Sequence, residues 1–374
     1  MKRLAIIHFL PLEFYPPVIN FINYISHKKL SFEVDVYSTA LSLTDNFFVN
    51  ESVNIHRFRM PDKHKGKLQR MLEYFKFYAS VFLHLLKNKP TDVLYYETLS
   101  FLPVYAYKIS MRFLGKSPRI FCHFHEYITP LEYKTGMILN RVIHTLEKKQ
   151  YARMDWISHT NEDRMQFFKK DNPGIKFHNT YILPNYPPAS WLNPNRQNKN
   201  TLPVRIVYAG ALGMDTMYIK EFAKWVESKN GTVMWDIYSL QDAGPLLAYL
   251  SSIGSRFIHF KGQVNYYDLP GVLEVYQVGV ILYKGHIPNY IYNAPNKLFE
   301  YYACGLDTWF PVEMKTSHAY VTNNSYPRIV AVDFQNMEEF DLAQMIDHSN
   351  LTYQNSPYFY EKVLDPLWRK LSMT

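Results

Sequence analysis

Short apolar runs alternate with longer amphipathic stretches along the first half of the chain. Strands are predicted at 4–9, 32–37, 55–59, 92–96, 119–124, 156–159 and 181–183. Helices are predicted at 18–25, 67–88, 102–114 and 140–153, where apolar residues recur at helical spacing. Strands that alternate with helices predict a parallel sheet with right-handed crossovers, which is a Rossmann-like half.

The alternation restarts after a segment rich in proline and asparagine, which runs from Pro187 to Pro203 and is the best linker candidate. Strands are then predicted at 204–208, 232–238, 257–260, 278–282 and 308–310, and helices at 218–228, 245–253, 268–276 and about 295–304. The predicted fold class is therefore α/β, with two successive Rossmann-like domains whose parallel sheets face a cleft.

The stretch from Asn293 to Gly305 predicts a helix of about three turns. Pro295 suits its first turn, Asn293 or Ala294 suits the cap, and Gly305 suits a left-handed end. The N-terminus of such a helix is an anion site, and Lys297 adds a positive charge there. Glu300 follows Lys297 by three residues and shares its face, so an ordinary surface ion pair is the plainer interpretation.

Composition limits the class of protein. The 374 residues suggest two domains, and a hydrophobic content of 47% supports sizeable cores. A net charge of +8 favours anionic partners such as nucleotide phosphates or acidic lipids. The two cysteines give no disulfide framework or zinc pattern, and the apolar run near Met1 is too short for a signal peptide. We expect a cytoplasmic protein, either soluble or at the inner face of the membrane.

Ligands of open parallel sheets bind beyond the carboxyl ends of the strands. The residues at those ends are His8, Glu97, His125, Glu126, Asn185, Gly210 to Gly213, Ser239 and Gly262. His125 can donate a hydrogen bond or a proton to a ligand, and Glu126 can orient it. His123 alternates onto the same side of its strand, and we interpret it as an interior residue.

Gly210 and Gly213 allow backbone amides to approach a phosphate closely, although a tight turn alone would also use glycine. The sequence contains neither an Asp-x-Asp motif nor a His/Cys cluster at metal-ligand spacing. We therefore expect a diphosphate to be held without a metal, by Lys297, backbone amides and helix dipoles.

The predicted helix at 67–88 carries aromatic and basic residues. It could rest on an anionic membrane, but a crossover helix with a solvated basic face is the favoured interpretation. Aromatic and basic residues are not grouped as in nucleic-acid platforms, so no nucleic-acid partner is expected.

Five segments, in order, resemble the retaining nucleotide-sugar glycosyltransferases of the GT-B fold (glycosyltransferase family 4-like, group 1 type). They read RIFCHFHE at 119–126, YILPNY at 181–186, IVYAGALG at 206–213, FIHFKGQV at 257–264 and PNKLFEYYACG at 295–305. The last is similar to the family's PxKxxEYxAxGxP segment and is the most specific. The resemblance covers nearly the whole chain.

The resemblance implies a hexosyltransferase-type enzyme (EC 2.4) of bacterial surface polysaccharide synthesis. Its donor would be a nucleotide-diphosphate sugar, UDP rather than GDP, and its acceptor a polysaccharide or lipid-linked glycan. Residues 1–187 would form the acceptor domain, 188–202 the linker, 203–352 the donor domain, and 353–374 a helix that returns to the first domain.

The resemblance also implies residue roles. Glu300 would accept both ribose hydroxyls, while Lys297, with Asn296 and Leu298 at the helix start, would hold the diphosphate. Gly210 and Gly213 would let the backbone approach it, Gly262 and Val264 would lie at the base, and His125 would face the transferred sugar.

The sequence departs from the family in several places. Ala211 and residues 217–220 do not reproduce the usual Arg and Lys pair, and Tyr292 stands where many members have a second Glu. A catalytically silent GT-B module that binds a nucleotide or glycan is therefore the main alternative. A GT-B-like sugar-nucleotide epimerase is less favoured, because the helix motif is of the transferase type.

Overall fold

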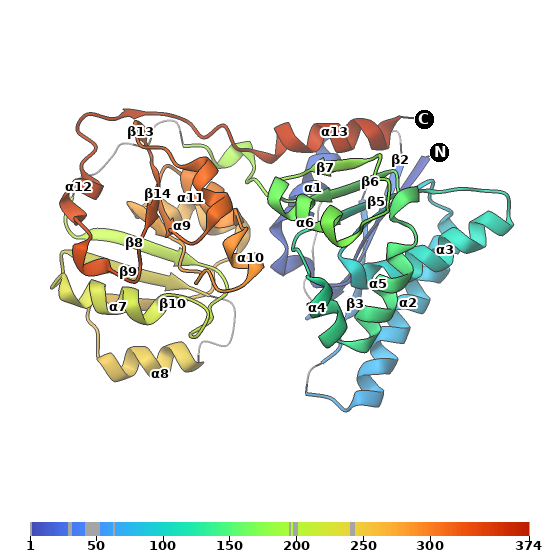
Figure 1. Ribbon diagram of the computed structural model, residues 1–374, viewed down its shortest axis with the longest axis horizontal. Helices are drawn as coiled ribbons and strands as arrows, with labels where there is room; N and C mark the ends of the chain where they lie inside the picture. Colours follow the sequence, from blue (N-terminus) through green and yellow to red (C-terminus); the bar gives the residue numbers. More distant parts are fainter. Residues whose placement is uncertain are drawn as a thin grey trace. The chain divides into compact units, whose positions relative to one another are not determined.

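The computed structural model describes residues 2–28, 32–41, 53–62, 64–193, 196, 201–239 and 244–373. The chain divides into two units (Figure 1). Unit 1 comprises Met1–Pro184 and Glu361–Thr374, and unit 2 comprises Asn185–Tyr360. Of the predicted linker, residues 194, 195 and 197–200 lie outside the described residues, while Trp191 is buried in a core of unit 2.

Unit 1 contains a parallel sheet, seven-stranded in its described part, with the order β3-β2-β1-β4-β5-β6-β7. The strands are β1 (Lys2–His8), β2 (Phe32–Ala40), β3 (Val53–Arg59), β4 (Asp92–Tyr96), β5 (Arg119–Phe124), β6 (Trp156–His159) and β7 (Thr180–Ile182). The helices are α1 (Pro16–His27), α2 (Lys67–Asn88), α3 (Phe101–Phe113), α4 (Pro130–Thr135), α5 (Ile138–Lys148) and α6 (Glu162–Asp171). The order reverses between β1 and β4, which defines a topological switch point.

Unit 2 repeats this plan with a parallel sheet of order β10-β9-β8-β11-β12-β14 among the described residues. The strands are β8 (Val204–Ala209), β9 (Val233–Tyr238), β10 (Ile258–Gly262), β11 (Val278–Val280), β12 (Asp307–Pro311) and β14 (Ile329–Val332), with a separate pair β13 (Ser325–Tyr326) and β15 (Thr352–Tyr353). The helices are α7 (Ile219–Ser228), α8 (Gly244–Ile253), α9 (Leu269–Leu273), α10 (Pro288–Ile291), α11 (Asn296–Ala303) and α12 (Leu342–Ile346). Here the switch point lies between β8 and β11.

The core of unit 2 lies on both faces of its sheet, as the residues of β8 illustrate. Ile206 and Tyr208 belong to one buried cluster, whereas Val207 and Ala209 belong to another. Successive side chains of a strand point to opposite faces, and each face is covered by helices. Leu298 of α11 joins the second cluster, so α11 packs on that face.

The last helix, α13 (Tyr360–Ser372), packs on unit 1, as its hydrogen bonds show. Lys2 Nζ donates to the carbonyl of Met373 at 2.7 Å, and Arg119 donates to that of Lys370 at 3.0 Å. Lys370 Nζ donates to Asn179 Oδ1 at 2.9 Å. The end of the chain therefore returns to its first domain, and the two units with their parallel sheets define the GT-B fold class.

Several predicted elements differ from the structure. The sequence did not predict α4, α6, α10 or β14, and it extended strand β11 by two residues. The helix predicted at 18–25 begins two residues earlier, at Pro16 and Pro17, because the first turn of a helix needs no N–H from its residues.

Helix α2 differs from its prediction in how its apolar residues are buried. Its fully buried residues begin at Phe77 and include Leu85, while Leu68 and Phe75, nearer the start of the helix, are each 67% exposed. No described helix is long and apolar enough to cross a membrane.

Candidate functional site

In unit 2, Lys297 of α11 lies against the glycine turn that follows β8. A Cβ atom added to Gly210 would collide with the end of the Lys297 side chain, so a larger residue there would push this ammonium group aside. Gly210 also has a φ of +138°, which L side chains rarely adopt. The structure thus brings Gly210 and Lys297, which are 87 positions apart in the sequence, together at the switch point of the sheet.

Two tyrosine rings flank the ammonium group of Lys297. The Nζ atom lies 5.3 Å from the ring centroid of Tyr208 and 5.7 Å from that of Tyr283, and it donates to the Tyr283 hydroxyl at 3.3 Å. These contacts are cation–π interactions that hold the charge beside the turn. Neither tyrosine was predicted from the sequence, since Tyr208 lies inside β8 and Tyr283 lies a few residues beyond the end of β11.

Glu300 lies one turn beyond Lys297 and is buried. Burial raises the pKa of Glu300 to about 7, an effect that the positive charge of Lys297 opposes. The two residues form no ion pair within 4 Å, and no hydrogen bond from the described part of the chain reaches the Glu300 carboxylate. The interpretation of an ordinary surface Lys–Glu pair is therefore wrong, and the carboxylate retains acceptor capacity for a ligand's hydroxyl groups.

Helix α11 is shorter than predicted and begins differently. It spans eight residues, and Pro295 is the N-cap itself, with no side-chain hydrogen bond, in place of Asn293 or Ala294. Asn296 and Lys297 are the first helical residues, so their amide groups have no acceptor within the helix. Leu298 is fully buried and anchors this end, and Gly305 ends the helix with the predicted left-handed φ, at +78°.

A buried hydrogen bond fixes α11 to the end of β8. The backbone N–H of Ala209, the residue before Gly210, donates to the hydroxyl of Tyr301 at 2.8 Å. A side chain at Gly279 of β11 would collide with the Tyr301 ring, so this glycine admits the tyrosine. The position of Lys297 relative to Gly210 therefore rests on contacts of the buried core.

The other predicted donor-binding residues lie at different places in unit 2. The Gly213 N–H donates to the Met217 sulfur at 3.3 Å, and a Cβ at Gly213 would meet the Thr216 side chain, so this glycine shapes the turn. Gly262 ends β10 with a φ of +78° and open space around it. Val264 is partly buried against the second core cluster. Among the described residues, no hydrogen bond joins Gly213, Gly262 or Val264 to Lys297.

In unit 1, residues from three strand ends meet near the switch point. The ring centroid of His125, just after β5, lies 6.0 Å from that of His8 at the end of β1. His125 also stacks on Tyr96 of β4 at 5.1 Å. Burial lowers the pKa of His8 to about 3, which keeps its imidazole neutral. His123 is an interior residue, as predicted, with its Nδ1 atom 2.9 Å from Ser158 Oγ.

Glu97, which follows β4, holds the backbone at His125. Its carboxylate accepts the His125 N–H at 2.8 Å, while Arg164 donates to the His125 carbonyl at 2.6 Å. Burial, together with the charge of Glu126, raises the pKa of Glu97 to about 8. Glu97 also has a φ of +62°, which costs a non-glycine residue roughly 1–3 kcal/mol. Such strain often marks functional positions, and sequence alone could not reveal it.

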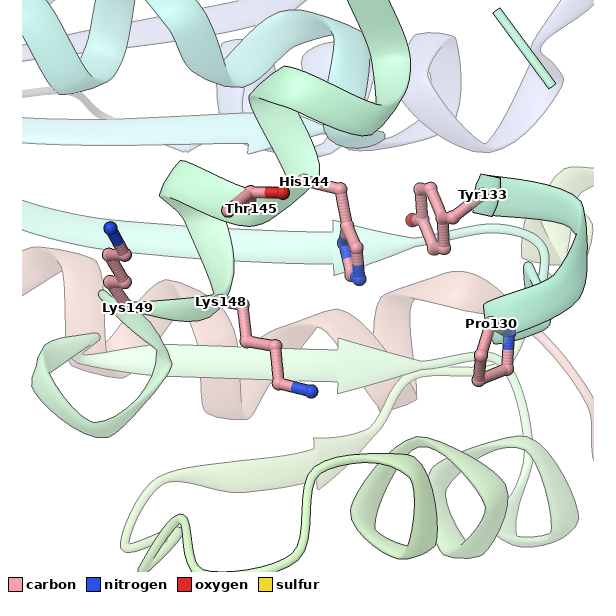
Figure 2. Close-up of a pocket in the computed structure, with 6 residues that line it drawn as sticks. All are labelled: Pro130, Tyr133, His144, Thr145, Lys148 and Lys149. Carbon is pink, nitrogen blue, oxygen red and sulfur yellow. The ribbon is translucent and has the colours of Figure 1, made fainter. Parts of the chain in front are cut away.

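Glu126 is exposed and lies at the edge of a pocket in unit 1. Figure 2 shows the larger part of this pocket, about 420 Å³, with the His144 and Tyr133 rings side by side and Lys148 below them. These rings stack with centroids 3.6 Å apart. A smaller cavity of about 70 Å³ shares Tyr133, His144 and Lys148 and is also lined by Glu126. The structure therefore joins Glu126 to a basic, aromatic pocket that the sequence analysis did not predict.

The buried carboxylate of Glu147 joins several residues around this pocket. Glu147 of α5 accepts hydrogen bonds from the hydroxyls of Tyr95 at 2.7 Å, Thr98 at 2.9 Å and Tyr151 at 3.1 Å. Thr98 is also 2.7 Å from the hydroxyl of Tyr133, which connects the pocket wall to the residue after Glu97. A fully satisfied network of this kind holds its members rigidly.

Within the described ranges, no group of three or more His, Cys, Asp or Glu side chains is placed to hold a metal ion. The ionisable groups of α11 at this place are Lys297, which lies beside Gly210, and Glu300, which lies one turn further along the helix. Together with free helix amides, they could hold a diphosphate and hydroxyl groups.

Comparison with known proteins gives structural relatives but no sequence relatives. No family model and no curated sequence matches the chain. The lipopolysaccharide outer core galactosyltransferase WaaB matches with a TM-score of 0.63 at 12% identity, covering 99% of this chain and 100% of that chain. Anabaena HepE, in complex with UDP and glucose, matches with a TM-score of 0.63 at 9% identity over 100% of both chains.

One further relative has a different activity. A Listeria monocytogenes protein described as a UDP-N-acetylglucosamine 2-epimerase matches with a TM-score of 0.57 at 10% identity, covering 98% of this chain and 95% of that chain. These comparisons establish that the chain has the GT-B fold. At identities this low they establish the fold alone, and the activity has to be argued from the site.

Proposed function

We propose that the protein is a glycosyltransferase that moves a sugar from a nucleotide-diphosphate sugar to a glycan acceptor, with retention of configuration. The observation that carries this proposal is the position of Lys297 against Gly210, one turn from the buried carboxylate of Glu300. A cation and free helix amides bind the phosphates of a nucleoside diphosphate, and a carboxylate accepts hydrogen bonds from its ribose hydroxyls. Among the structural relatives, Anabaena HepE is described in complex with UDP and glucose and in complex with UDP-glucose, which supports a UDP donor over a GDP donor.

The donor roles follow from the chemistry of each group. The ammonium group of Lys297 and the backbone N–H groups of Asn296 and Lys297 would bind the diphosphate and stabilise its charge as it leaves, so no metal ion is needed. The Leu298 N–H, which was also expected to take part, already donates to the Pro295 carbonyl at 3.0 Å, so Leu298 supports the site through its burial instead. Glu300 would accept the two ribose hydroxyls once it is ionised. Gly210 and Gly213 would allow the close approach of the turn, and Gly262 and Val264 would lie beside the base.

The acceptor would bind to unit 1. His125 and Glu126 are the side chains proposed to act at the transferred sugar, with Glu97 and Arg164 fixing the backbone between them. The pocket at Tyr133, with its aromatic wall and Lys148, suits a sugar ring and an anionic group. We propose a polysaccharide or lipid-linked acceptor of bacterial surface polysaccharide synthesis, met at the inner face of the cytoplasmic membrane.

The test is direct. Thermal shift with UDP- and GDP-sugars identifies the donor, because a ligand that binds the folded state raises the melting temperature. Transfer is then measured with lipid-linked and soluble glycans, and the anomeric configuration of the product is read by NMR. Shifts with UDP-sugars followed by transfer with retention support the proposal, whereas no shift with any nucleotide sugar contradicts it.

Two other functions share the fold. A catalytically silent module is favoured by the absence of the expected Arg and Lys near Ala211, and donor binding without any turnover would identify it. An epimerase is represented among the structural relatives. Conversion of a UDP-sugar to its epimer without an acceptor would identify that activity.

A further inference from the structure

The first half of α2 presents large apolar side chains to solvent. Leu68, Met71, Leu72 and Phe75 are exposed by 67%, 62%, 50% and 67%. We call these four residues the α2 stripe. They follow the spacing i, i+3, i+4, i+7, which places them on one face of the helix. In Figure 1 the first turns of α2 extend beyond the sheet and the neighbouring helices of unit 1.

The α2 stripe lies on the line of the helix along which Phe82 and Leu86 pack against the core further on, and it continues that line past the core toward the start of α2. At about 100° per residue, its four side chains fall within an arc of about 100°. The fully buried residues Phe77, Val81 and Leu85 are centred roughly 130° away around the helix. In the first turns of α2 this line of apolar side chains is exposed and no described residue covers it, and such a patch usually marks an interaction surface.

The charges around the α2 stripe are ordered. Lys67 and Lys76 are both exposed and lie on opposite sides of the α2 stripe. By the same geometry, Lys67 lies about 100° to one side of Leu68 and Lys76 about 80° to the other. Glu73 lies about 140° from Leu68 and is already paired with Lys65 at 2.8 Å. The border of the apolar face is therefore cationic, and its acidic neighbour points away.

We propose that the α2 stripe docks unit 1 onto a lipid surface that carries anionic headgroups. An apolar face between lysines is the arrangement of helices that lie in the membrane interface, where apolar side chains enter the acyl boundary and lysines reach the phosphates. The net charge of +8 favours the same partner. The inference goes beyond the donor and acceptor chemistry of the proposed function and does not depend on it.

A second copy of the chain fits this surface less well than lipid does. A symmetric dimer through the α2 stripe would place the flanking lysines of one copy near those of the other, and like charges repel. An acidic protein partner would match the charges but would need a rigid complementary groove, whereas a lipid surface adapts to any apolar face.

The experiment is vesicle flotation of the full chain. Vesicles are made of phosphatidylcholine alone or of phosphatidylcholine with 30% phosphatidylglycerol, a composition chosen for the assay, at low and high salt. The paired variants are Leu72→Ser with Phe75→Ser, and Lys67→Gln with Lys76→Gln. The matched control is Phe113→Ser, at an aromatic residue of α3 that is 87% exposed in the same unit.

We expect the wild type to float with the anionic vesicles, the serine variant to lose at least about tenfold in partitioning, and the Phe113 control to behave as wild type. The glutamine variant should lose binding only to anionic vesicles, with a weaker salt dependence. Equal binding of the wild type and serine variant, or no binding to either vesicle, overturns the proposal. Light scattering that shows a dimer lost in the serine variant overturns it in favour of a second copy.

Folding is checked independently of lipid. The α2 stripe is exposed, so the serine variant should keep the wild-type melting temperature within a few degrees and bind nucleotide sugars as before. A serine variant that melts much lower would show that these side chains pack inside the protein, and that result also contradicts a docking surface.

Discussion

Glu300 gives the donor site a dependence on pH. Its folded-state pKa is about 7, raised by burial, so the carboxyl is largely neutral at pH 6 and ionised at pH 8. Only the ionised form accepts hydrogen bonds with both oxygens. We expect the affinity for a UDP-sugar to increase as the pH rises through about 7, and Glu300→Gln to abolish this increase. Isothermal titration calorimetry at pH 6, 7 and 8 measures both proteins, and an equal pH profile would contradict the role.

The same pKa predicts an effect on the stability of the ligand-free protein. A folded-state pKa above the usual value of 4.5 means that the folded state holds its proton more tightly. The stability gained below pH 4.5 is therefore lost as the pH rises through about 7. The difference between the two pKa values corresponds to roughly 3 kcal/mol in the free energy of unfolding. In Glu300→Gln this part of the pH dependence should disappear, which denaturant unfolding at pH 5 and 8 would measure.

Gly210 and Gly254 form a matched pair for testing the glycine turn. Both have a positive φ, so Ala at either position should cost about 1–2 kcal/mol of stability. Only at Gly210 would the new Cβ reach the Lys297 ammonium group, since nothing lies within 4 Å of that position at Gly254. We expect Gly210→Ala to weaken donor binding by roughly tenfold. Equal donor affinity in the two variants, measured by calorimetry, would show that the contact is irrelevant.

The individual residues of the donor site could be predicted better than their contacts. The sequence alone indicated Gly210, Lys297 and Glu300 as strand-end and helix-start residues. It could not indicate Tyr208 and Tyr283, because their contact with Lys297 depends on where two strands end in space. The strain at Glu97 was equally hidden, since a φ of +62° is imposed by the surrounding fold.

At the scale of elements, a buried hydrogen bond between Ala209 and Tyr301 connects α11 to the sheet. Tyr301→Phe leaves the Ala209 N–H without its buried acceptor, which costs about 1–3 kcal/mol. We expect a lower unfolding free energy and also weaker donor binding, because Lys297 would lose its fixed position. Tyr249→Phe is the control, since no described residue bonds to the Tyr249 hydroxyl. Both variants are measured by denaturant unfolding and by calorimetry with the donor. The same unfolding free energy and donor affinity in the two variants would contradict this function of Tyr301.

The elements that the sequence predicted well are those with long, regular patterns. The strands before each switch point are continuous apolar runs, because both faces of a parallel sheet are buried. Helices α4 and α6 carry few apolar residues at regular spacing and were missed. The case of α2 is instructive: periodicity predicted the helix correctly but not the burial of its faces, since a core face and the α2 stripe have the same spacing.

At the scale of the whole molecule, α13 connects the end of the chain to unit 1. Leu364, Leu367 and Leu371 are buried, and each contributes about 1.5–3 kcal/mol. A chain that ends before α13 should lose roughly 10 °C or more in the unfolding of unit 1. Hydrogen exchange would show faster exchange in β1 and β5, while UDP binding to unit 2 should persist. Loss of UDP binding together with α13 would contradict the assignment of the donor site to unit 2 alone.

The central claim is that Lys297 binds the donor diphosphate, and Lys297→Ala tests it most directly. Calorimetry with the UDP-sugar identified by thermal shift gives the dissociation constant, and Lys224→Ala, at an exposed lysine of α7 in the same unit, is the control. The loss of a charge-assisted hydrogen bond should cost about 1.5–3 kcal/mol, a roughly 10- to 150-fold weaker affinity, with the control unchanged. A folded Lys297→Ala protein that binds the donor as tightly as the wild type would contradict the account.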